Sequence, residues 1–154
     1  MTVEVRKAGW PDVLAIEPYI VTDQWQRLTA LGVPVEVTLG RMLAAAEDTI
    51  YATADGHPLC LGAVQASGGF LCQAGAIWMV VTDELRRHPK RFMRESKNWI
   101  EELKTRYVSL HDFCQVGDAR NIRWMKWLGF ELHDPMPSPL DGTMVYPVEW
   151  RRWA

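Results

Sequence analysis

The longest uninterrupted run of apolar residues, 76–81, predicts the central strand of the fold. Such a run is typical of a strand that is buried on both faces. A charged turn over 82–88 is expected next, followed by a helix that begins near Pro89. Phe92, Met93 and Trp99 share one face of this helix, while charged residues take the remainder. The pattern therefore predicts a buried strand that leads into a charged helix start.

The chain before this strand is expected to form one strand, two or three short helices and a hairpin. The alternation of Val3 and Val5 with charged residues over 2–8 predicts a half-buried strand. Helices are expected over 11–20, 22–31 and 38–47, and strands over 49–54 and 59–66. The two strands are joined by Asp55-Gly56-His57-Pro58, in which Asp-Gly is a strong hairpin signal. A second turn is expected at 67–69.

After the Pro89 helix the sequence predicts a strand over 106–113, parallel to the first because strand–helix–strand crossovers are right-handed. Asp118 is expected to cap a further helix that ends at Leu128 before Gly129. Strands over 130–133 and 143–148 close the chain, and the proline-rich loop 135–139 is excluded from a sheet centre. The order β-αα(α)-βββ-α-β-α-ββ indicates a mixed α/β domain.

Composition and charge narrow the class of protein. A chain of 154 residues with 48% hydrophobic and 23% charged residues is expected to form one domain over 1–154. The net charge of −2 disfavours a general nucleic-acid binder. The three cysteines, Cys60, Cys72 and Cys114, have no zinc-ligand spacing, so we expect reduced thiols and no metal. Neither a signal peptide nor a membrane span is recognisable, so a cytoplasmic protein is expected.

Positive charge gathers around the start of the Pro89 helix, at Arg86, Arg87, Lys90 and Arg91. Cations at a helix N-terminus oppose the helix dipole, whereas an anion such as phosphate is favoured there. This cluster therefore indicates an anion site. In the alternative interpretation, nearby acidic residues neutralise part of the cluster and the rest is a solvated face.

The order of elements and the segment 118–130, which ends in Leu128-Gly129-Phe130, resemble the GNAT superfamily of N-acetyltransferases. Within it the chain looks most like small, divergent phage-encoded proteins, including those described as internal virion protein A-like. The resemblance implies a mixed central sheet that is splayed between two parallel strands. The narrower likeness implies a phage or host protein partner and a location in the host cytoplasm or the virion.

The resemblance also implies a cosubstrate. The family binds acetyl-CoA between two parallel strands, here 76–81 and 107–113, and transfers the acetyl group directly to an amine, here of unknown identity. The pantetheine arm would pair with the end of the first strand and the pyrophosphate would rest on the following loop and helix start. The cofactor-binding residues implied in this way are Met79, Val80, Val81, Arg86, Arg87, His88, Lys90, Arg91, Asp118 and Asn121.

The sequence departs from the family at two functional places. Pro89 and Arg91 stand where the family's pyrophosphate loop has small residues, chiefly glycines, that let backbone N–H groups approach the phosphates. Met125 stands where many members have a tyrosine general acid, and Asp118 replaces a usual asparagine. Three functions therefore stay open: an N-acetyltransferase with a degenerate pyrophosphate loop, a non-catalytic binding or phage assembly protein on the same scaffold, and a local polyanion binder.

Four residues are candidates for catalysis, namely Glu84, His111, Asp112 and Cys114. Glu84 follows the first central strand and alternatively pairs with Arg86 or Arg87. His111 and Asp112 are neighbours on a strand and point to opposite faces, so only one can face the site. Either is a candidate general base, and the alternative for each is a paired or capping role. A nucleophilic Cys114 needs a base beside it, and no sequence feature identifies one.

Overall fold

The computed structural model of the chain describes residues 2–67 and 73–153, which divide into two compact units. Unit 1 comprises Met1–Gln65 and Trp78–Ser96, and unit 2 comprises Ala66–Ile77 and Lys97–Ala154. Strand β4 (Ala74–Val81) and helix α5 (Pro89–Arg106) each run from one unit into the other. The single domain expected over 1–154 stays a prediction. Cys72 and most of the predicted turn at 67–69 lie outside the described residues.

Unit 1 contains the strands β1 and β2, most of β3 and the end of β4, together with the helices that precede and follow them. Besides the end of β4, its elements are β1 (Val3–Arg6), α1 (Trp10–Ile16), the 3-10 turn η1 (Glu17–Tyr19), α2 (Thr22–Thr29), α3 (Val35–Ala44), β2 (Asp48–Ala54), most of β3 (His57–Ser67), α4 (Asp83–Arg87) and the beginning of α5. The strands follow the order β1-β2-β3-β4, with β2 antiparallel to both β1 and β3.

The β2–β3 hairpin is confirmed, with a shorter turn than expected. Asp55 and Gly56 have φ angles of 48° and 80°, as a two-residue type I′ turn requires. Gly56 adopts this conformation without strain, and Asp55 is among the residue types that tolerate it. His57 and Pro58 already belong to β3, and a register irregularity opposite them lies between Ala52 and Thr53.

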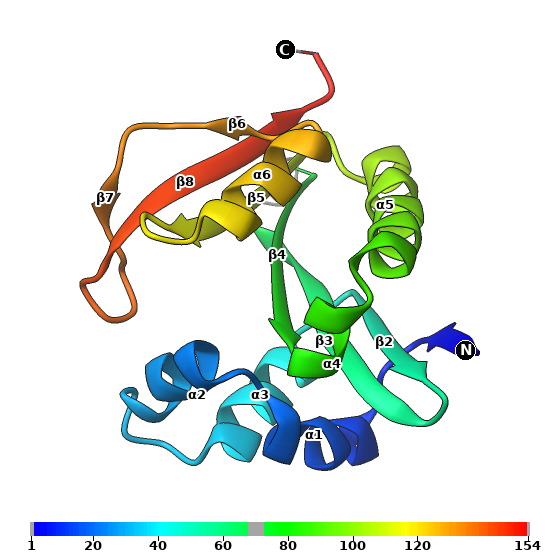
Figure 1. The fold of residues 1–154 in the computed structure, drawn as a ribbon. Coiled ribbons are helices and arrows are strands. Elements are labelled where there is room, and N and C mark those ends of the chain that lie inside the picture. Colours follow the sequence, from blue (N-terminus) through cyan, green and yellow to red (C-terminus); the bar gives the residue numbers. More distant parts are fainter. Residues whose placement is uncertain (1, 68–72, 154) are drawn as a thin grey trace. The chain divides into compact units, whose positions relative to one another are not determined.

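The core of unit 1 lies between its helices and its strands. In Figure 1, α1, α2 and α3 lie together beside β2 and β3. Apolar side chains from these elements form one cluster whose buried members are Val13, Ile16, Ile20, Val35, Leu39, Tyr51, Leu61 and Val80. Gly40 of α3 permits close packing of α1, because a Cβ atom there would lie 2.4 Å from the Trp10 ring.

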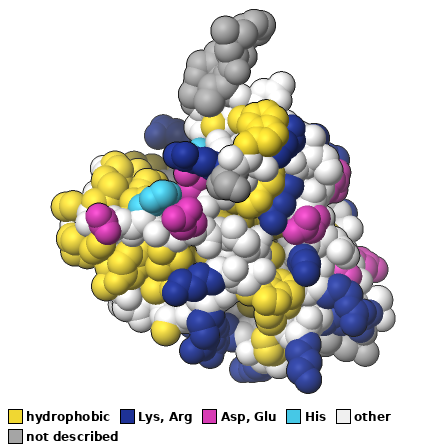
Figure 2. Space-filling model, turned by 90° about the horizontal axis from the view of Figure 1, so that it is seen from above, with side chains coloured by type: hydrophobic (Ala, Val, Ile, Leu, Met, Phe, Trp, Pro, Cys, Tyr) yellow, Lys and Arg dark blue, Asp and Glu magenta, His cyan; other side chains and the backbone are white. Residues whose placement is uncertain are grey.

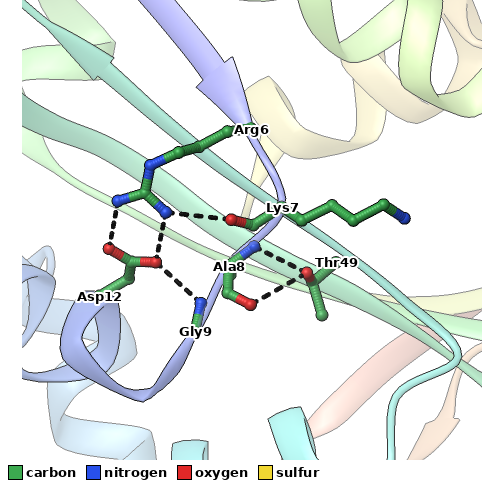
Figure 3. Close-up of polar contacts among 6 residues, drawn as sticks. All are labelled: Arg6, Lys7, Ala8, Gly9, Asp12 and Thr49. Carbon is green, nitrogen blue, oxygen red and sulfur yellow. Dashed lines mark hydrogen bonds and ion pairs between the residues drawn. The ribbon is translucent and has the colours of Figure 1, made fainter.

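A polar cluster fixes the start of α1 (Figure 3). The guanidinium group of Arg6 donates to both carboxylate oxygens of Asp12, at 2.6 and 2.8 Å. The same carboxylate accepts the Gly9 N–H at 2.8 Å, and the Gly9 carbonyl accepts the Asp12 N–H at 3.0 Å. Asp12 is therefore buried with all of its charge compensated, and it holds the first turn of the helix against the end of β1.

Three expectations for unit 1 were wrong in detail. The helix expected over 38–47 spans Val35–Ala44, because Val35 joins Leu39 in the core and the Glu47 N–H already donates to Val64 of β3. The first strand is not half-buried. Val5 is 40% exposed, so the face of the strand that carries its apolar residues is not covered at this position. Strand β4 is not buried on both faces either, since Met79 and Val81 are only partly buried.

Unit 2 contains the other half of the strands and the end of the long helix. Its elements are the beginning of β4, the end of α5, β5 (Ser109–Gln115), α6 (Ala119–Trp127), β6 (Glu131–Leu132), β7 (Met136–Pro137) and β8 (Met144–Arg151). The predicted parallel pair is confirmed: β4 runs parallel to β5, with Ala74, Gly75 and Ala76 opposite Ser109, Leu110 and His111. β8 is antiparallel to β5, β6 and β7. The mixed α/β fold with eight described strands is therefore as expected.

The predicted strand after α5 began too early in the sequence. The strand expected over 106–113 is Ser109–Gln115, because α5 continues to Arg106. The guanidinium group of Arg152 donates to the carbonyl oxygens of Lys104 and Tyr107, at 2.8 and 2.9 Å. These bonds satisfy carbonyl groups at the end of α5 that would otherwise lack a partner, which favours the longer helix.

The later helix and the loop that follows it agree well with the sequence. Asp118 caps α6 by accepting the Asn121 N–H at 3.1 Å, and Gly129 follows the helix with a φ angle of 96°. Met136 and Pro137, in the predicted proline-rich loop, form the short strand β7 on β8. No helix in residues 2–67 and 73–153 is long and apolar enough to cross a bilayer.

Candidate functional site

The end of β4 in unit 1 has one edge that does not pair with β3. We call this the outer edge; it consists of the Met79 carbonyl, the Val81 N–H and the Val81 carbonyl. Thr82, the next residue, turns to the other side: its N–H donates to the Leu59 carbonyl of β3 at 3.1 Å. Alternate residues of a strand present their backbone groups to opposite edges, so the three groups of the outer edge face the same way. The Val80 side chain points into the core of unit 1.

Helix α2 and the residues just before it occupy this outer edge. The side-chain amide of Gln24 donates through Nε2 to the Met79 carbonyl at 3.2 Å and accepts the Val81 N–H through Oε1 at 2.8 Å. The Val21 N–H donates to the Val81 carbonyl at 3.0 Å, and Ile20 forms an antiparallel bridge with Thr82. Nothing in the sequence signalled Gln24, because 55 and 57 residues separate it from its two partners.

The prediction of a charged turn over 82–88 was wrong, because this stretch forms helix α4 (Asp83–Arg87). Thr82 caps this helix, because its hydroxyl oxygen accepts the Leu85 N–H at 3.4 Å while its O–H is placed to donate to the Pro58 carbonyl at 2.8 Å. Asp83 and Glu84 occupy the first turn and Arg86 and Arg87 the last, which is the favourable arrangement for the helix dipole.

The charges of α4 are largely paired. Glu84 contacts Arg87 at 2.9 Å and the His88 Nε2 at 3.3 Å. Arg86 lies 3.6 Å from the Asp23 carboxylate of α2. Glu84 therefore takes the ion-pairing role that the sequence offered as its alternative. Arg86 and Arg87 lie at the favourable end of α4, so their presence gives no independent reason to infer an anion at the start of α5.

The start of α5 is rich in positive charge. The helix begins at Pro89, as predicted, and its first turn contains no acidic residue. Lys90 and Arg91 are both exposed there. Within residues 2–67 and 73–153, Lys90 and Arg94 form no ion pair with a carboxylate. Two cations in the first turn oppose the helix dipole, so this helix start is the place in unit 1 where an anion would be stabilised.

In unit 2, His111 of β5 belongs to a group of ionisable side chains that includes Glu149 and Arg151 of β8. Its Nδ1 lies 3.3 Å from the Glu149 carboxylate, and its Nε2 lies 3.0 Å from the Ser109 hydroxyl. Glu149 is also 3.5 Å from His133 and contacts Arg151. The carboxylate on Nδ1 fixes the orientation of the imidazole, while Nε2 lies within hydrogen-bond distance of the Ser109 hydroxyl. The sequence did not point to Glu149, which is opposite His111 only because of the β5–β8 register.

The remaining candidates of unit 2 lie at the end of β5 and the start of α6. Burial raises the pKa of the Cys114 thiol to about 12, and the Asp112 and Asp118 carboxylates add to the effect. The thiol is therefore protonated at neutral pH and is a poor nucleophile. Its sulfur accepts a hydrogen bond from the Asn121 side chain at 3.4 Å. One Asp112 carboxylate oxygen accepts the Phe113 N–H at 2.7 Å.

The predicted site residues thus fall into two groups, one in each unit. The group in unit 1 contains Met79, Val80, Val81, Glu84, Arg86, Arg87, His88, Lys90 and Arg91; the group in unit 2 contains His111, Asp112, Cys114, Asp118 and Asn121. Met125, which the sequence resemblance placed at the position of a tyrosine general acid, is fully buried in α6. In the part of the chain that the structure describes, no three His, Cys, Asp or Glu side chains are grouped so as to hold a metal ion.

Comparison with known proteins identifies the fold. No family model and no curated protein matches the sequence. Among solved structures, the chain is similar to an aminoglycoside acetyltransferase in complex with coenzyme A, with a TM-score of 0.71 and 14% identity over 99% of this chain and 96% of that one. It is also similar to the protein yncA from Salmonella typhimurium with acetyl-CoA as its cofactor, with a TM-score of 0.69 and 14% identity over 98% and 94% of the two chains.

A third similar structure is an acetyltransferase of the GNAT family from Streptococcus pneumoniae. Its TM-score is 0.68 and its identity 11%, over 97% of this chain and 99% of that one. The chain therefore has the fold of GNAT acetyltransferases, as the sequence predicted.

Proposed function

We propose that this protein is an N-acyltransferase that transfers an acetyl group from acetyl-CoA to an amine. The observation that carries the proposal is the similarity in fold, which extends over nearly the whole of both chains to structures that hold coenzyme A or acetyl-CoA. In such a reaction the C–S bond of the thioester breaks and a C–N bond forms. The proton lost by the amine is returned to the CoA thiolate.

Two features of unit 1 support a role in holding the cosubstrate. The outer edge of β4 has a carbonyl and an N–H two residues apart, which Gln24 bonds and which successive amides of an extended arm can also bond. The cations at the start of α5, above all Lys90, suit a pyrophosphate. Pro89 supplies no N–H, so the phosphates would be held by side-chain charge and by the helix dipole more than by the backbone.

One feature of unit 2 supports a role in proton transfer. Of the four catalytic candidates, His111 alone has the contacts of a general base, since Glu149 orients its ring through Nδ1. Cys114 is unsuited as a nucleophile because its thiol is protonated, and Glu84 is engaged by Arg87 and His88. Met125 is an apolar side chain in the core and has no proton to donate.

A second candidate function is a non-catalytic binding protein on the same scaffold, of which a phage virion or assembly component is one form. The observation that favours it is an exposed apolar area on unit 2. Figure 2 shows hydrophobic side chains gathered at the left of the view, the side on which β7 and the start of β8 lie in Figure 1. Large exposed apolar residues of unit 2 include Phe113, Val116, Met136, Leu140 and Met144. Such areas mark interaction surfaces.

The test of the main proposal is a thermal melt with increasing acetyl-CoA. The melting temperature should rise with the concentration of acetyl-CoA, because a ligand that binds only the folded state stabilises it. Lys90→Glu should abolish the rise. Arg123→Glu makes a similar charge reversal at an exposed position in the middle of α6 and should keep it.

Three other outcomes would point elsewhere. No rise at millimolar acetyl-CoA would overturn the acyltransferase proposal. A rise without release of free CoA, across a panel of primary amines, would favour the binding protein. A rise with DNA alone that disappears with salt would indicate a polyanion binder.

A further inference from the structure

The side chain of Gln24 mimics the backbone of a neighbouring strand. In a parallel pair of strands, one residue donates its N–H and accepts through its C=O, to neighbours two positions apart on the facing strand. Gln24 does the same with its carboxamide: it donates to the Met79 carbonyl at 3.2 Å and accepts from the Val81 N–H at 2.8 Å. The outer edge of β4 is therefore an amide-binding edge.

The protein fills this edge by itself, within unit 1. Val21 contributes a third bond, from its N–H to the Val81 carbonyl at 3.0 Å. The polar groups of a buried or half-buried strand edge need partners, and here the Gln24 carboxamide supplies them for Met79 and Val81. Gln24 is partly buried and lies in the first turn of α2, so its carboxamide is held close to the edge by the helix.

We infer that Gln24 is a built-in competitor at the outer edge of β4, and that it must leave before the amide-bearing arm of an acyl carrier can bind there. The inference rests on the proposed function, because the pantetheine arm of CoA is the amide-bearing chain in question. The Met79 carbonyl needs a donor and the Val81 N–H needs an acceptor. The N–H of one amide and the C=O of the next amide along an extended chain can meet both needs, whereas a phosphate group, which only accepts, cannot.

The inference has a quantitative consequence for affinity. When the binding-competent state of a protein is only a fraction of the whole, the apparent affinity is reduced by that fraction. Two hydrogen bonds to a half-buried edge favour the closed state by a modest amount, so removal of the Gln24 carboxamide should strengthen binding of CoA by roughly three- to thirtyfold. A ligand without the amide arm gains nothing from the change.

The experiment measures dissociation constants by calorimetry for two ligands, CoA and adenosine 3′,5′-bisphosphate, which shares the nucleotide end of CoA but lacks the pantetheine arm. The variants are Gln24→Ala and Gln24→Met; the second keeps the length and packing of the side chain and serves where alanine impairs folding. Gln26→Ala is the matched control, because Gln26 lies on the same helix and is exposed.

The expected result is tighter binding of CoA to a Gln24 variant, with unchanged binding of the bisphosphate and no effect of Gln26→Ala. Unchanged or weaker binding of CoA to the folded Gln24 variants would overturn the inference and leave the proposed function intact. If neither ligand binds the wild-type protein or any variant, the proposed function falls and the inference falls with it.

Discussion

Two helices of unit 1, α1 and α5, begin in opposite ways. The start of α1 is closed by the chain itself: Asp12 is buried, accepts the Gly9 N–H and pairs with Arg6. The start of α5 has a proline, two exposed cations and no acidic residue in its first turn. The start of α1 is stabilised by its own side chains, whereas the start of α5 gives up some stability, and under the proposed function its positive charge holds an anion. A residue that matters for folding and a residue that matters for binding should therefore separate cleanly in experiments.

The largest effect on stability is expected from Asp12→Ala. The change removes the bonds to Gly9 and Arg6 and leaves buried backbone at the start of α1 without a partner, which should lower the free energy of unfolding by about 2 kcal/mol. Denaturant unfolding measures this directly. Asp23→Ala, at an exposed carboxylate in the first turn of α2, is the matched control and should change stability by less than about 0.5 kcal/mol. Equal losses in the two variants would contradict the contrast.

Acid should weaken the stabilising contribution of the Asp12 carboxylate. Burial raises the pKa of Asp12, but the hydrogen bonds from Arg6 and Gly9 outweigh it, so the pKa lies below its ordinary value of 3.8. Because the folded-state pKa is the lower one, Asp12 contributes stability above the unfolded pKa, and that contribution is lost as pH falls through the folded pKa. The difference in stability between wild type and Asp12→Asn should therefore shrink below about pH 4. A difference that stays constant down to pH 2 would show that the charge of Asp12 is not involved.

The smallest effect on stability, and the one of opposite sign, is expected from Lys90→Glu without ligand. An acidic residue in the first turn of α5 suits the helix dipole, so the variant should be more stable than wild type by about 0.5–1 kcal/mol. The same variant should lose its response to acetyl-CoA. Comparison of the two chemical denaturation curves at low salt measures the first part. A destabilised Lys90→Glu would mean that Lys90 has a structural partner and is not reserved for an anion.

Local chemistry in the sequence predicted the parts of the fold that depend on neighbouring residues. The Asp-Gly hairpin, the Asp118 cap with Gly129 beyond the helix, and the start of α5 at Pro89 all follow from a few adjacent positions. The turn over 82–88 was misjudged because Thr82 obtains its capping role from bonds to β3 as well as from its position in sequence.

Contacts between distant parts of the chain could not be predicted. Arg152 extends α5 by bonding to carbonyl groups 48 and 45 residues away, and Glu149 reaches His111 through the register of two strands. Gln24 was missed for the same reason: its role depends on where α2 lies beside β4, and a single glutamine in a helix carries no signal of that. The resemblance named Met79 and Val81 as residues that would bind the cosubstrate. It did not name Gln24, whose side chain bonds to their backbone groups.

The most direct test of the central claim, that the outer edge of β4 and the start of α5 bind acetyl-CoA, is an NMR titration of the isotopically labelled protein. Saturable shifts are expected for the Val81 backbone amide, the Gln24 side-chain amide and the Lys90 backbone amide, with the Gly9 amide at the start of α1 unchanged. Spectra in which these three signals stay in place at millimolar acetyl-CoA, or in which only residues of unit 2 respond, would contradict the account.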